Sequence, residues 1–485
     1  ASSQPLDGYR LNLSYAVYLR LAKLRSESTR KMNLDRTWFR SMVPARGDGF
    51  FAGSVLAALL FAGILAPRIT PFIAGIVSVY TVVLAAANGN WRKIWMPLAQ
   101  PSLIVIGLLA FGTLACLSAL WAVAPWRALA KGGLTISIAL MAIVAITLIE
   151  ESRSRRLAEG LAIGVAAGCV YVGLEIVSQF ELRMAAYNYL GFLPIKDKYH
   201  HWEAGRIVRI DGHVMNRSIA LLVILLWPAL LAIDRCWFGI CRQAWKAALL
   251  SAIALVTFYS VHESSKIAMM VGCIAWILSK WWPKWWHRAI MTAWIIATLF
   301  MPLLASAAYT GLKLHQADWL QYSARDRIVI WGYASELVRE RPLLGFGADS
   351  NYVMGRSHTV SEHPRDHPHP RSLAPHPHNV FLQVWFELGL AGAVILMLLG
   401  RALLNALSLQ PEEDRALGYA TFASCATLAT FTWSLWQAWF LGAFCLAAVS
   451  LRLALHLSRA PRNTDSTAQE QAGITMPSNR HRPAN

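Results

Sequence analysis

Two arginines stand where a phosphate-binding helix end would place them. Arg325 and Arg327 lie in residues 322–342, whose apolar residues recur at the spacing of an amphipathic helix. Ser323, with Asp326 three residues later, predicts a capping box at the start of this helix. Cations in a first turn add to the positive end of the helix dipole. The pattern favours binding of an anion, above all phosphate, although nearby aspartates could neutralise the arginines instead.

A histidine with the properties of a proton acceptor follows in the chain. His378 precedes Asn379 and an apolar run that begins at Val380. Asparagine is a good N-cap, so we expect Asn379 to start a helix and to leave His378 one residue outside it. The helix dipole disfavours the imidazolium form there, which keeps the ring neutral and basic. A base beside an anion site suits transfer from a lipid-linked phosphate or diphosphate donor to a hydroxyl group.

Further charged residues could join this anion site or have a structural role. Arg206 and Arg209 precede an apolar run that starts near Ser218, and Lys266 follows two serines at the end of a predicted hairpin. Charges at a membrane boundary are functional candidates by default. Lys266 could equally form a structural ion pair with Glu387, or with Glu175, that holds two helices together.

Three other patterns indicate no cofactor. Residues 363–379 alternate proline with histidine, which predicts an extended strap. A metal site is the alternative there, with the candidate ligands His367, His369, His376 and His378. Gly345-x-Gly347 lacks the third glycine of a dinucleotide-binding loop and predicts a tight turn. His262-Glu263 begins like a zinc-protease motif, but Lys266 occupies the second ligand position.

Composition assigns these residues to a membrane protein. Of the 485 residues, 56% are apolar and 15% are charged, against about 25% charged in soluble domains. Runs of about twenty apolar residues, long enough to cross a bilayer, exclude a soluble enzyme, a disordered chain and an all-β barrel. The predicted spans are 50–66, 69–88, 99–120, 128–149, 158–179, 216–233, 245–261, 265–280, 288–306, 379–400, 416–433 and 435–455.

The basic residues predict the orientation of these spans. The net charge is +18, and residues 1–48 alone hold nine Lys and Arg. Lys and Arg accumulate on the cytoplasmic side of membrane proteins, so twelve spans would leave both termini in the cytoplasm. The predicted organisation is a basic segment 1–48, nine spans in 49–306 with an outer loop 181–215, a large outer loop 307–378, three spans in 379–456, and a disordered tail 457–485. Because the first methionine is Met32, we expect part of residues 1–31 to be added sequence.

The polar chemistry is concentrated outside the predicted spans. Loop 307–378 holds eight Lys and Arg, seven Asp and Glu, and seven of the 14 histidines. Transporters instead keep ionisable groups near the middle of the bilayer, between repeated halves. The sequence therefore favours an enzyme that works at the outer membrane boundary.

Three features resemble the bacterial O-antigen ligase/polymerase family. They are Arg327-x-x-x-Trp331 followed by Arg341-Pro-Leu-Leu-Gly-Phe-Gly347, His378-Asn379 followed after nine residues by Gly389-x-x-Gly392, and Trp121-Ala-Val-Ala-Pro125. The resemblance covers roughly residues 100–400, and the His378 motif is its most specific part. Ser265-Lys266 departs from the Ser-Arg pair expected in many relatives, and lysine lacks the bidentate fork of arginine.

The resemblance implies a fold and a reaction. The fold is an all-α polytopic membrane protein with about twelve transmembrane helices and a partly helical periplasmic cap, in the bacterial inner membrane. The reaction is that of an inverting, GT-C-like glycosyltransferase that needs no metal or other cofactor. It would move O-antigen polysaccharide from undecaprenyl diphosphate to the lipid A–core oligosaccharide at the periplasmic face, with no nucleic acid partner. The residues that it implies are His378 as base and Arg327 as diphosphate clamp, with Arg325, Arg209, Arg206 and Lys266 as further diphosphate contacts and Asn379 and His376 in support.

Other functions stay open at this stage. An O-antigen polymerase shares the donor but extends another lipid-linked glycan. A protein-directed oligosaccharyltransferase of the same group is a third enzyme hypothesis. A twelve-span exporter or flippase fits the span count, and a structural assembly partner is the remaining alternative.

Overall fold

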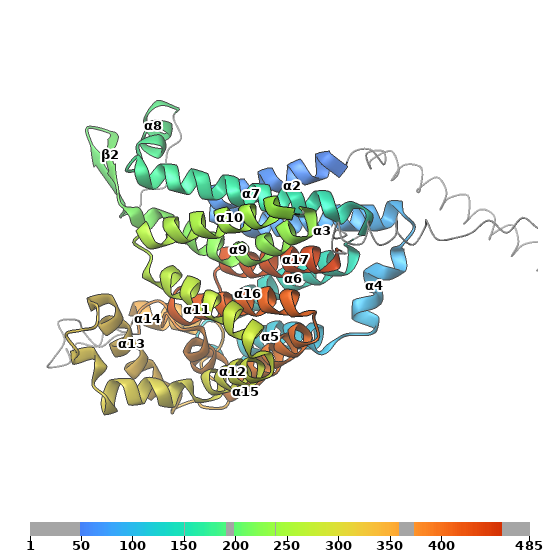
Figure 1. The fold of residues 1–485 in the computed structure, drawn as a ribbon. Coiled ribbons are helices and arrows are strands. Elements are labelled where there is room, and N and C mark those ends of the chain that lie inside the picture. The colour runs from blue at the N-terminus through green and yellow to red at the C-terminus, as the bar shows by residue number, and fades with distance from the viewer. Residues whose placement is uncertain (1–48, 150, 191–197, 238, 358–372, 458–485) are drawn as a thin grey trace, which may run out of the picture.

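Helices make up most of the fold in the computed structural model (Figure 1). It describes residues 49–149, 151–190, 198–237, 239–357 and 373–457. The predicted basic segment 1–48 and most of the predicted tail lie outside the described residues, as do His367 and His369 of the strap.

Each of the twelve predicted spans corresponds to one helix. These helices are α2 (Gly49–Leu65), α3 (Thr70–Ala87), α5 (Leu103–Leu117), α6 (Pro125–Leu148), α7 (Glu151–Val177), α9 (Asn216–Cys236), α10 (Gly239–Tyr259), α11 (Glu263–Trp281), α12 (Pro283–Ser306), α15 (Val380–Ser408), α16 (Glu412–Phe431) and α17 (Ala438–His456). A short helix, α4 (Trp91–Ala99), connects α3 to α5.

The predicted number of membrane spans is too high. Among the described residues, nine helices are long and apolar enough to cross a membrane. α2 has only 17 residues. α11 carries Lys266 and Lys280, and α16 begins with Glu412, Glu413 and Asp414. The prediction rested on runs of about twenty apolar residues. It overestimated the count because one run forms a helix that is too short, and two others contain or adjoin charged residues.

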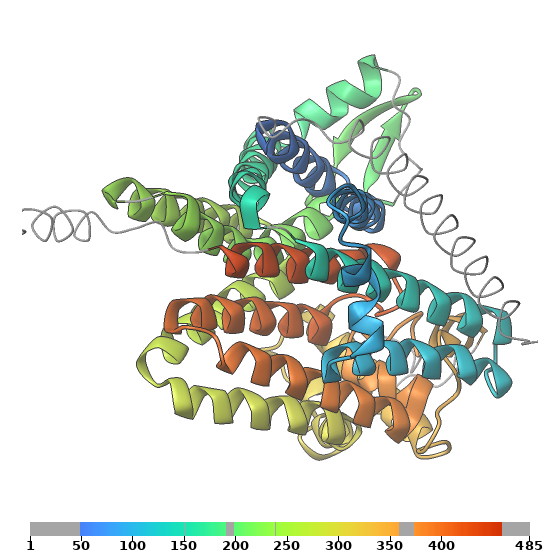
Figure 2. The ribbon, with the colours of Figure 1, turned by 90° about the vertical axis from the view of Figure 1, so that its right-hand side faces the viewer.

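The core of the bundle is built around α9. Every residue of this helix from Ser218 to Cys236 is buried inside the protein. It packs against α7, α10, α16 and α17, and a helix that is apolar on all sides is expected at such a central position. Figure 2 shows α2 and α7 side by side on one flank of this core, next to α8 (Glu181–Tyr189).

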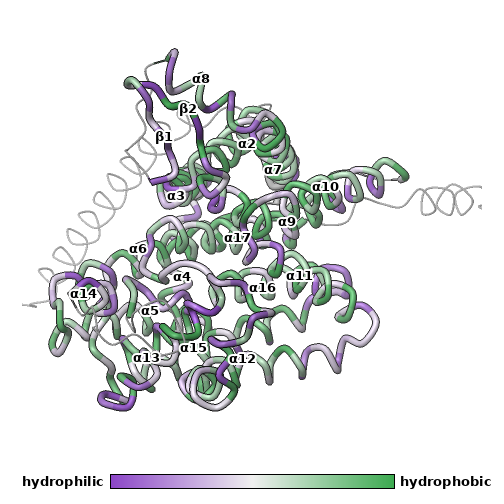
Figure 3. Tube along the Cα trace, turned by 90° about the vertical axis from the view of Figure 1, so that its left-hand side faces the viewer, coloured by the Kyte–Doolittle hydropathy of each residue, from purple (hydrophilic) through white to green (hydrophobic). Residues whose placement is uncertain are grey.

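The elements outside the bundle gather at one end of it. The predicted outer loop 181–215 forms α8 and an antiparallel hairpin, β1 (His200–Glu203) and β2 (Arg206–Ile210). The second forms α13 (Tyr322–Val338) and α14 (Ser350–Ser357), and both groups lie at the same end in Figure 1. Figure 3 shows hydrophilic residues along the hairpin and hydrophobic ones along the bundle helices. The partly helical cap is therefore present, with a β-hairpin that the sequence did not predict. Single turns complete the fold: η1 (Pro67–Ile69), η2 (Ser118–Leu120), η3 (Gly212–Met215), η4 (Ala307–Gly311) and η5 (Leu314–Gln316).

The glycine-containing segment after α13 forms the predicted tight turn. Gly345 and Gly347 have φ angles of +64° and +92°. The backbone N–H of Gly347 donates to the carbonyl of Glu387 in α15 at 2.8 Å. On the other side, Trp121 Nε1 donates to the carbonyl of Leu344 at 3.1 Å. The turn thus joins all three sequence features that carried the family resemblance.

We expect Gly347→Ala to destabilise the protein. Alanine disfavours the positive φ angle, and its Cβ would lie 2.2 Å from that of Ala122. Strain of this kind costs about 1–3 kcal/mol. Thermal unfolding in detergent should show a lower midpoint for this variant. The matched control is Gly133→Ala in α6, where nothing lies within 4 Å of the added Cβ; if both variants unfold at the same temperature, the strain argument fails.

Candidate active site

The two arginines predicted to bind an anion, near the start of α13, differ in their partners. The N-cap is Gln321, without a side-chain hydrogen bond. The predicted capping box at Ser323 is therefore wrong, because the helix begins before this residue. Arg325 pairs with Asp318 at 3.4 Å. Arg327 has no ion pair or hydrogen bond with any residue that the structure describes.

Arg327 is consequently the candidate anion ligand of this helix. The side chain is half-buried. Burial lowers the pKa of its guanidinium, and only Asp326 acts in the opposite direction. A guanidinium remains protonated in proteins. A half-buried cation without an ion pair is stabilised when an anion binds to it.

His378 is held at the entry to α15. Asn379 is the N-cap of this helix, and its side chain accepts a hydrogen bond from the N–H of Leu382 at 3.0 Å, which confirms that prediction. His378 lies one residue outside the helix with a φ of +54°. Its Nδ1 lies 2.7 Å from the carbonyl oxygen of Thr432. Since a carbonyl oxygen only accepts, Nδ1 must carry the proton, and Nε2 keeps its lone pair.

The surroundings keep this imidazole neutral. Burial lowers the pKa of His378 to about 3, assisted by His376 and by the charge of Arg327. The rings of His376 and His378 lie 4.0 Å apart. Burial and Arg327 also lower the pKa of His376 to about 4. Arg327 is therefore close enough to act electrostatically on both histidines, so the structure brings the predicted base and the predicted anion ligand together.

α13 is anchored directly to the strap that carries His378. Trp331 lies one helical turn after Arg327, on the same face of α13. Its Nε1 donates to the carbonyl of Pro377 at 2.7 Å. This contact gives a physical reason for the Arg327-x-x-x-Trp331 spacing, because one residue faces the anion site while the other fixes the helix beside it.

The sequence pointed to His262 only as part of an incomplete zinc-protease motif, and it did not predict that Trp433 would lie beside it in the site. His262, between α10 and α11, has its Nδ1 2.6 Å from Ser265 Oγ. Burial, Arg327 and His213 lower the pKa of His262 to about 3. Its ring lies 5.1 Å from that of Trp433, the residue after Thr432. The only sequence signals for this contact were polar and aromatic residues at the ends of apolar runs.

The remaining predicted anion ligands have other partners or other positions. Lys266 binds Glu263 at 2.8 Å rather than Glu387, so the alternative pair of Lys266 with Glu387 is not formed. Arg206 and Arg209 lie on the exposed hairpin, where Arg209 pairs with Asp211 at 3.0 Å. The outer loop 181–215 reaches the site through His213, which acts on His262, rather than through these arginines.

His376 and His378, the described histidines of the strap, form no metal site with other described residues. Within the described parts of the chain, no three His, Cys, Asp or Glu side chains are close enough to hold a metal ion. His376 and His378 are described, whereas the other two proposed ligands, His367 and His369, are not.

Comparison with known proteins agrees with the motifs that meet in this site. Residues 247–397 match the family described as O-Antigen ligase. The chain is also similar to proteins named "Putative polysaccharide ligase". The one from Rickettsia conorii is 24% identical to it over 50% of this chain and 58% of the relative. Those of Rickettsia prowazekii and Rickettsia typhi are 25% identical over 55% of this chain and 63% of the relative. The match spans less than two thirds of each of these relatives. The family resemblance is thereby confirmed: residues 247–397 form an O-antigen ligase family domain.

Proposed function

We propose that this chain transfers O-antigen polysaccharide from undecaprenyl diphosphate to the lipid A–core oligosaccharide, with inversion at the anomeric carbon. The family match and the names of the relatives support glycan transfer. The single observation that carries the mechanism is a neutral imidazole, with its Nε2 left without a hydrogen bond, beside a guanidinium that has no ion pair within the described parts of the chain.

In this mechanism His378 and Arg327 act on opposite sides of the reacting carbon. Nε2 of His378 takes the proton of the acceptor hydroxyl as its oxygen attacks the anomeric carbon. The bond from that carbon to the diphosphate oxygen breaks, and its electron pair stays on the departing undecaprenyl diphosphate. Arg327 stabilises the added negative charge. No other activation is required, because the diphosphate is already a good leaving group.

The two residues are also coupled electrostatically. A bound diphosphate offsets the charge of Arg327 and places negative charge near the imidazole. Both effects raise the pKa of His378 above its value in the free enzyme, towards the range in which a general base is most efficient. Lys266, which follows the serine bonded to His262, is a second candidate contact for the diphosphate. Arg325, Arg206 and Arg209 remain predictions in that role.

The pH dependence of the reaction follows from this coupling. An imidazole with a lowered pKa stays unprotonated, and so basic, above that lowered value. Since kcat/KM reports the free enzyme, it should stay level from about pH 8 down to about pH 5, where an ordinary histidine is mostly protonated. The acid limb of kcat should lie at higher pH, because kcat reports the substrate complex. Initial rates of glycan transfer across this range measure both; a fall of kcat/KM centred near pH 6.5 would contradict the assignment.

We further propose that the cap faces the periplasm and that both termini are cytoplasmic. The concentration of Lys and Arg in residues 1–48 supports this orientation. In loop 307–378 the Lys and Arg residues are nearly balanced by Asp and Glu, as expected for a loop outside the cytoplasm. In this orientation the site lies beside the outer leaflet, where the lipid-linked donor and the lipid-anchored acceptor are both present.

The acceptor decides between ligase and polymerase. Purified protein would be supplied with undecaprenyl-diphosphate-linked glycan, with and without lipid A–core, and the products separated on a gel. A ligase joins glycan to lipid A–core only when that acceptor is present. Elongation of the lipid-linked glycan in its absence would establish a polymerase instead.

A further inference from the structure

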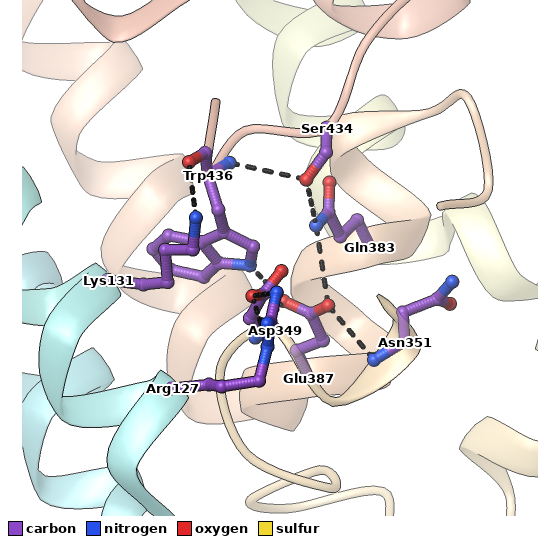
Figure 4. Close-up of polar contacts among 8 residues, drawn as sticks. All are labelled: Arg127, Lys131, Asp349, Asn351, Gln383, Glu387, Ser434 and Trp436. Carbon is purple, nitrogen blue, oxygen red and sulfur yellow. Dashed lines mark hydrogen bonds and ion pairs between the residues drawn. The ribbon is translucent and has the colours of Figure 1, made fainter. Parts of the chain in front are cut away.

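A carboxylate within α15 makes an unusual number of contacts for a residue with no part in the mechanism. Glu387 is fully buried. Its Oε2 accepts hydrogen bonds from the N–H of Asp349 at 3.1 Å and from Trp436 Nε1. Its Oε1 accepts from the N–H of Asn351 and from Gln383 Nε2, both at 3.3 Å. Figure 4 shows these donors converging on the carboxylate from three segments of the chain.

One branch of this network leads to the strap that carries His378. Asn351 donates its backbone N–H to Glu387 and its side-chain Nδ2 to the carbonyl of Ala374 at 2.9 Å. Ala374 has a φ of +50° and lies four residues before His378. Glu387 therefore fixes the position from which the strap approaches the site.

The other branch leads to the segment that supplies the partner of His378. Gln383 donates to Ser434 Oγ at 2.9 Å and accepts from the N–H of Leu435 at 3.0 Å. Both residues belong to the connection between α16 and α17. The same connection contains Thr432, whose carbonyl holds Nδ1 of His378. The carboxylate is thus linked both to the imidazole and to the group that orients it.

The chemical character of the network requires an acceptor at its centre. All four neighbours of the carboxylate are N–H donors, and a proton on either oxygen would find no acceptor among them, so the ionised form suits this network. Two cations of α6 lie in the same cluster: Arg127 pairs with Asp349 at 2.5 Å, and Lys131 donates to the carbonyl of Trp436 at 3.3 Å. They offset the charges of the two buried carboxylates.

We propose that Glu387 is a positioning residue of the active site, which holds the strap and the α16–α17 connection together so that Nε2 of His378 faces the acceptor. This inference rests on the proposed function for its kinetic consequences, but not for its structural ones. Glu387 does not touch the reacting atoms in this account. It acts through Asn351 and Gln383.

Glu387→Gln tests the proposal with a change of one atom. The amide turns one acceptor oxygen into a donor that faces two other donors, so two of the four hydrogen bonds to this side chain are lost. We expect kcat to fall about tenfold or more while KM changes little, as for loss of a contact that orients the base in the transition state. The imidazole should also become more hydrated, so the acid limb of kcat/KM should move up towards pH 6.5. The variant leaves unchanged the charged and titratable groups around the His378 imidazole, which are His376 and Arg327.

A milder variant and a matched control guard against simple misfolding. Asn351→Asp keeps the backbone contact with Glu387 but turns an oxygen towards the Ala374 carbonyl, so it should shift the same two readouts by a smaller amount. The control is Asp234→Asn, which alters a buried carboxylate that pairs with Lys246 at 2.9 Å at the C-terminal end of α9. It should lower the unfolding temperature without moving the pH profile. If Glu387→Gln behaves like this control, the proposal is overturned.

A second readout separates this proposal from the proposed function. Diethyl pyrocarbonate modifies neutral imidazoles, and mass spectrometry can follow His378 alone in the full-length protein. The wild type should react slowly, whereas Glu387→Gln should react several-fold faster, with a pH midpoint nearer that of free histidine. Equal reaction rates would overturn the positioning role. Failure of the wild type to transfer glycan would instead overturn the proposed function and leave the modification result standing.

Discussion

His378→Ala should lower the rate of glycan transfer by about 10²–10⁴-fold, the range that a general base contributes. The contact with Thr432 fixes the tautomer of His378 and leaves the lone pair of Nε2 free, which makes this imidazole the base. Loss should appear in kcat, because the proton moves only in the transition state. Initial rates with saturating donor and acceptor would measure it.

A second histidine provides the control for this substitution. His287 in α12 is also hydrogen bonded, with its Nδ1 2.7 Å from the hydroxyl of Tyr419, but it belongs to no part of the site. His287→Ala should retain most of the activity. If His378→Ala keeps more than about a tenth of the wild-type rate, general base catalysis by this residue is wrong. A transporter would show only slower export, and no chemical step to lose.

Arg327→Ala should reduce kcat by about 10²–10³-fold, as expected when one preorganised stabiliser of a developing negative charge is removed. The guanidinium has no ion pair among the described residues, so it is available to the diphosphate. Arg327→Lys should recover only part of the rate, because an ammonium group lacks the bidentate fork. Single-turnover rates with excess enzyme would separate this effect from weaker donor binding.

Arg325 is the matched control on the same helix turn. It differs from Arg327 chiefly in its ion pair with Asp318, whose side chain is fully exposed. Exposed pairs of this kind contribute about 0–1 kcal/mol, so Arg325→Ala should leave stability close to wild type. It should lower the rate much less than Arg327→Ala, because the Arg325 guanidinium already has a carboxylate partner. Equal losses from the two alanine variants would mean that α13 contributes general positive charge rather than one specific ligand.

The local features of the site could be predicted from the sequence. Asn379 caps α15 because the capping preference depends on residues that are neighbours in the chain. The apolar runs predicted all twelve bundle helices for the same reason, whereas the number that can cross a membrane depends on charges at their ends. Gly345 and Gly347 were predicted to form a turn because few other residues adopt positive φ angles.

The features that decide function depend on contacts between distant residues. Nothing local distinguishes Arg325 from Arg327; the difference is that Asp318 folds back onto only one of them. His262 enters the site because the α10–α11 hairpin meets the α16–α17 connection, about 170 residues later in the chain. Glu387 appeared as a possible partner of Lys266, but its actual partners are N–H donors from segments that no periodicity links.

The central claim is that this chain itself transfers glycan from a lipid-linked diphosphate with His378 as base. The most direct test combines purified wild-type protein, undecaprenyl-diphosphate-linked glycan, lipid A–core and excess EDTA, and measures joined glycan together with released lipid. We predict one undecaprenyl diphosphate released for each glycan joined, at a rate that EDTA does not change and that His378→Ala lowers by about 10²-fold or more. Transfer that is lost with EDTA, or that keeps more than about a tenth of its rate in His378→Ala, would contradict the account.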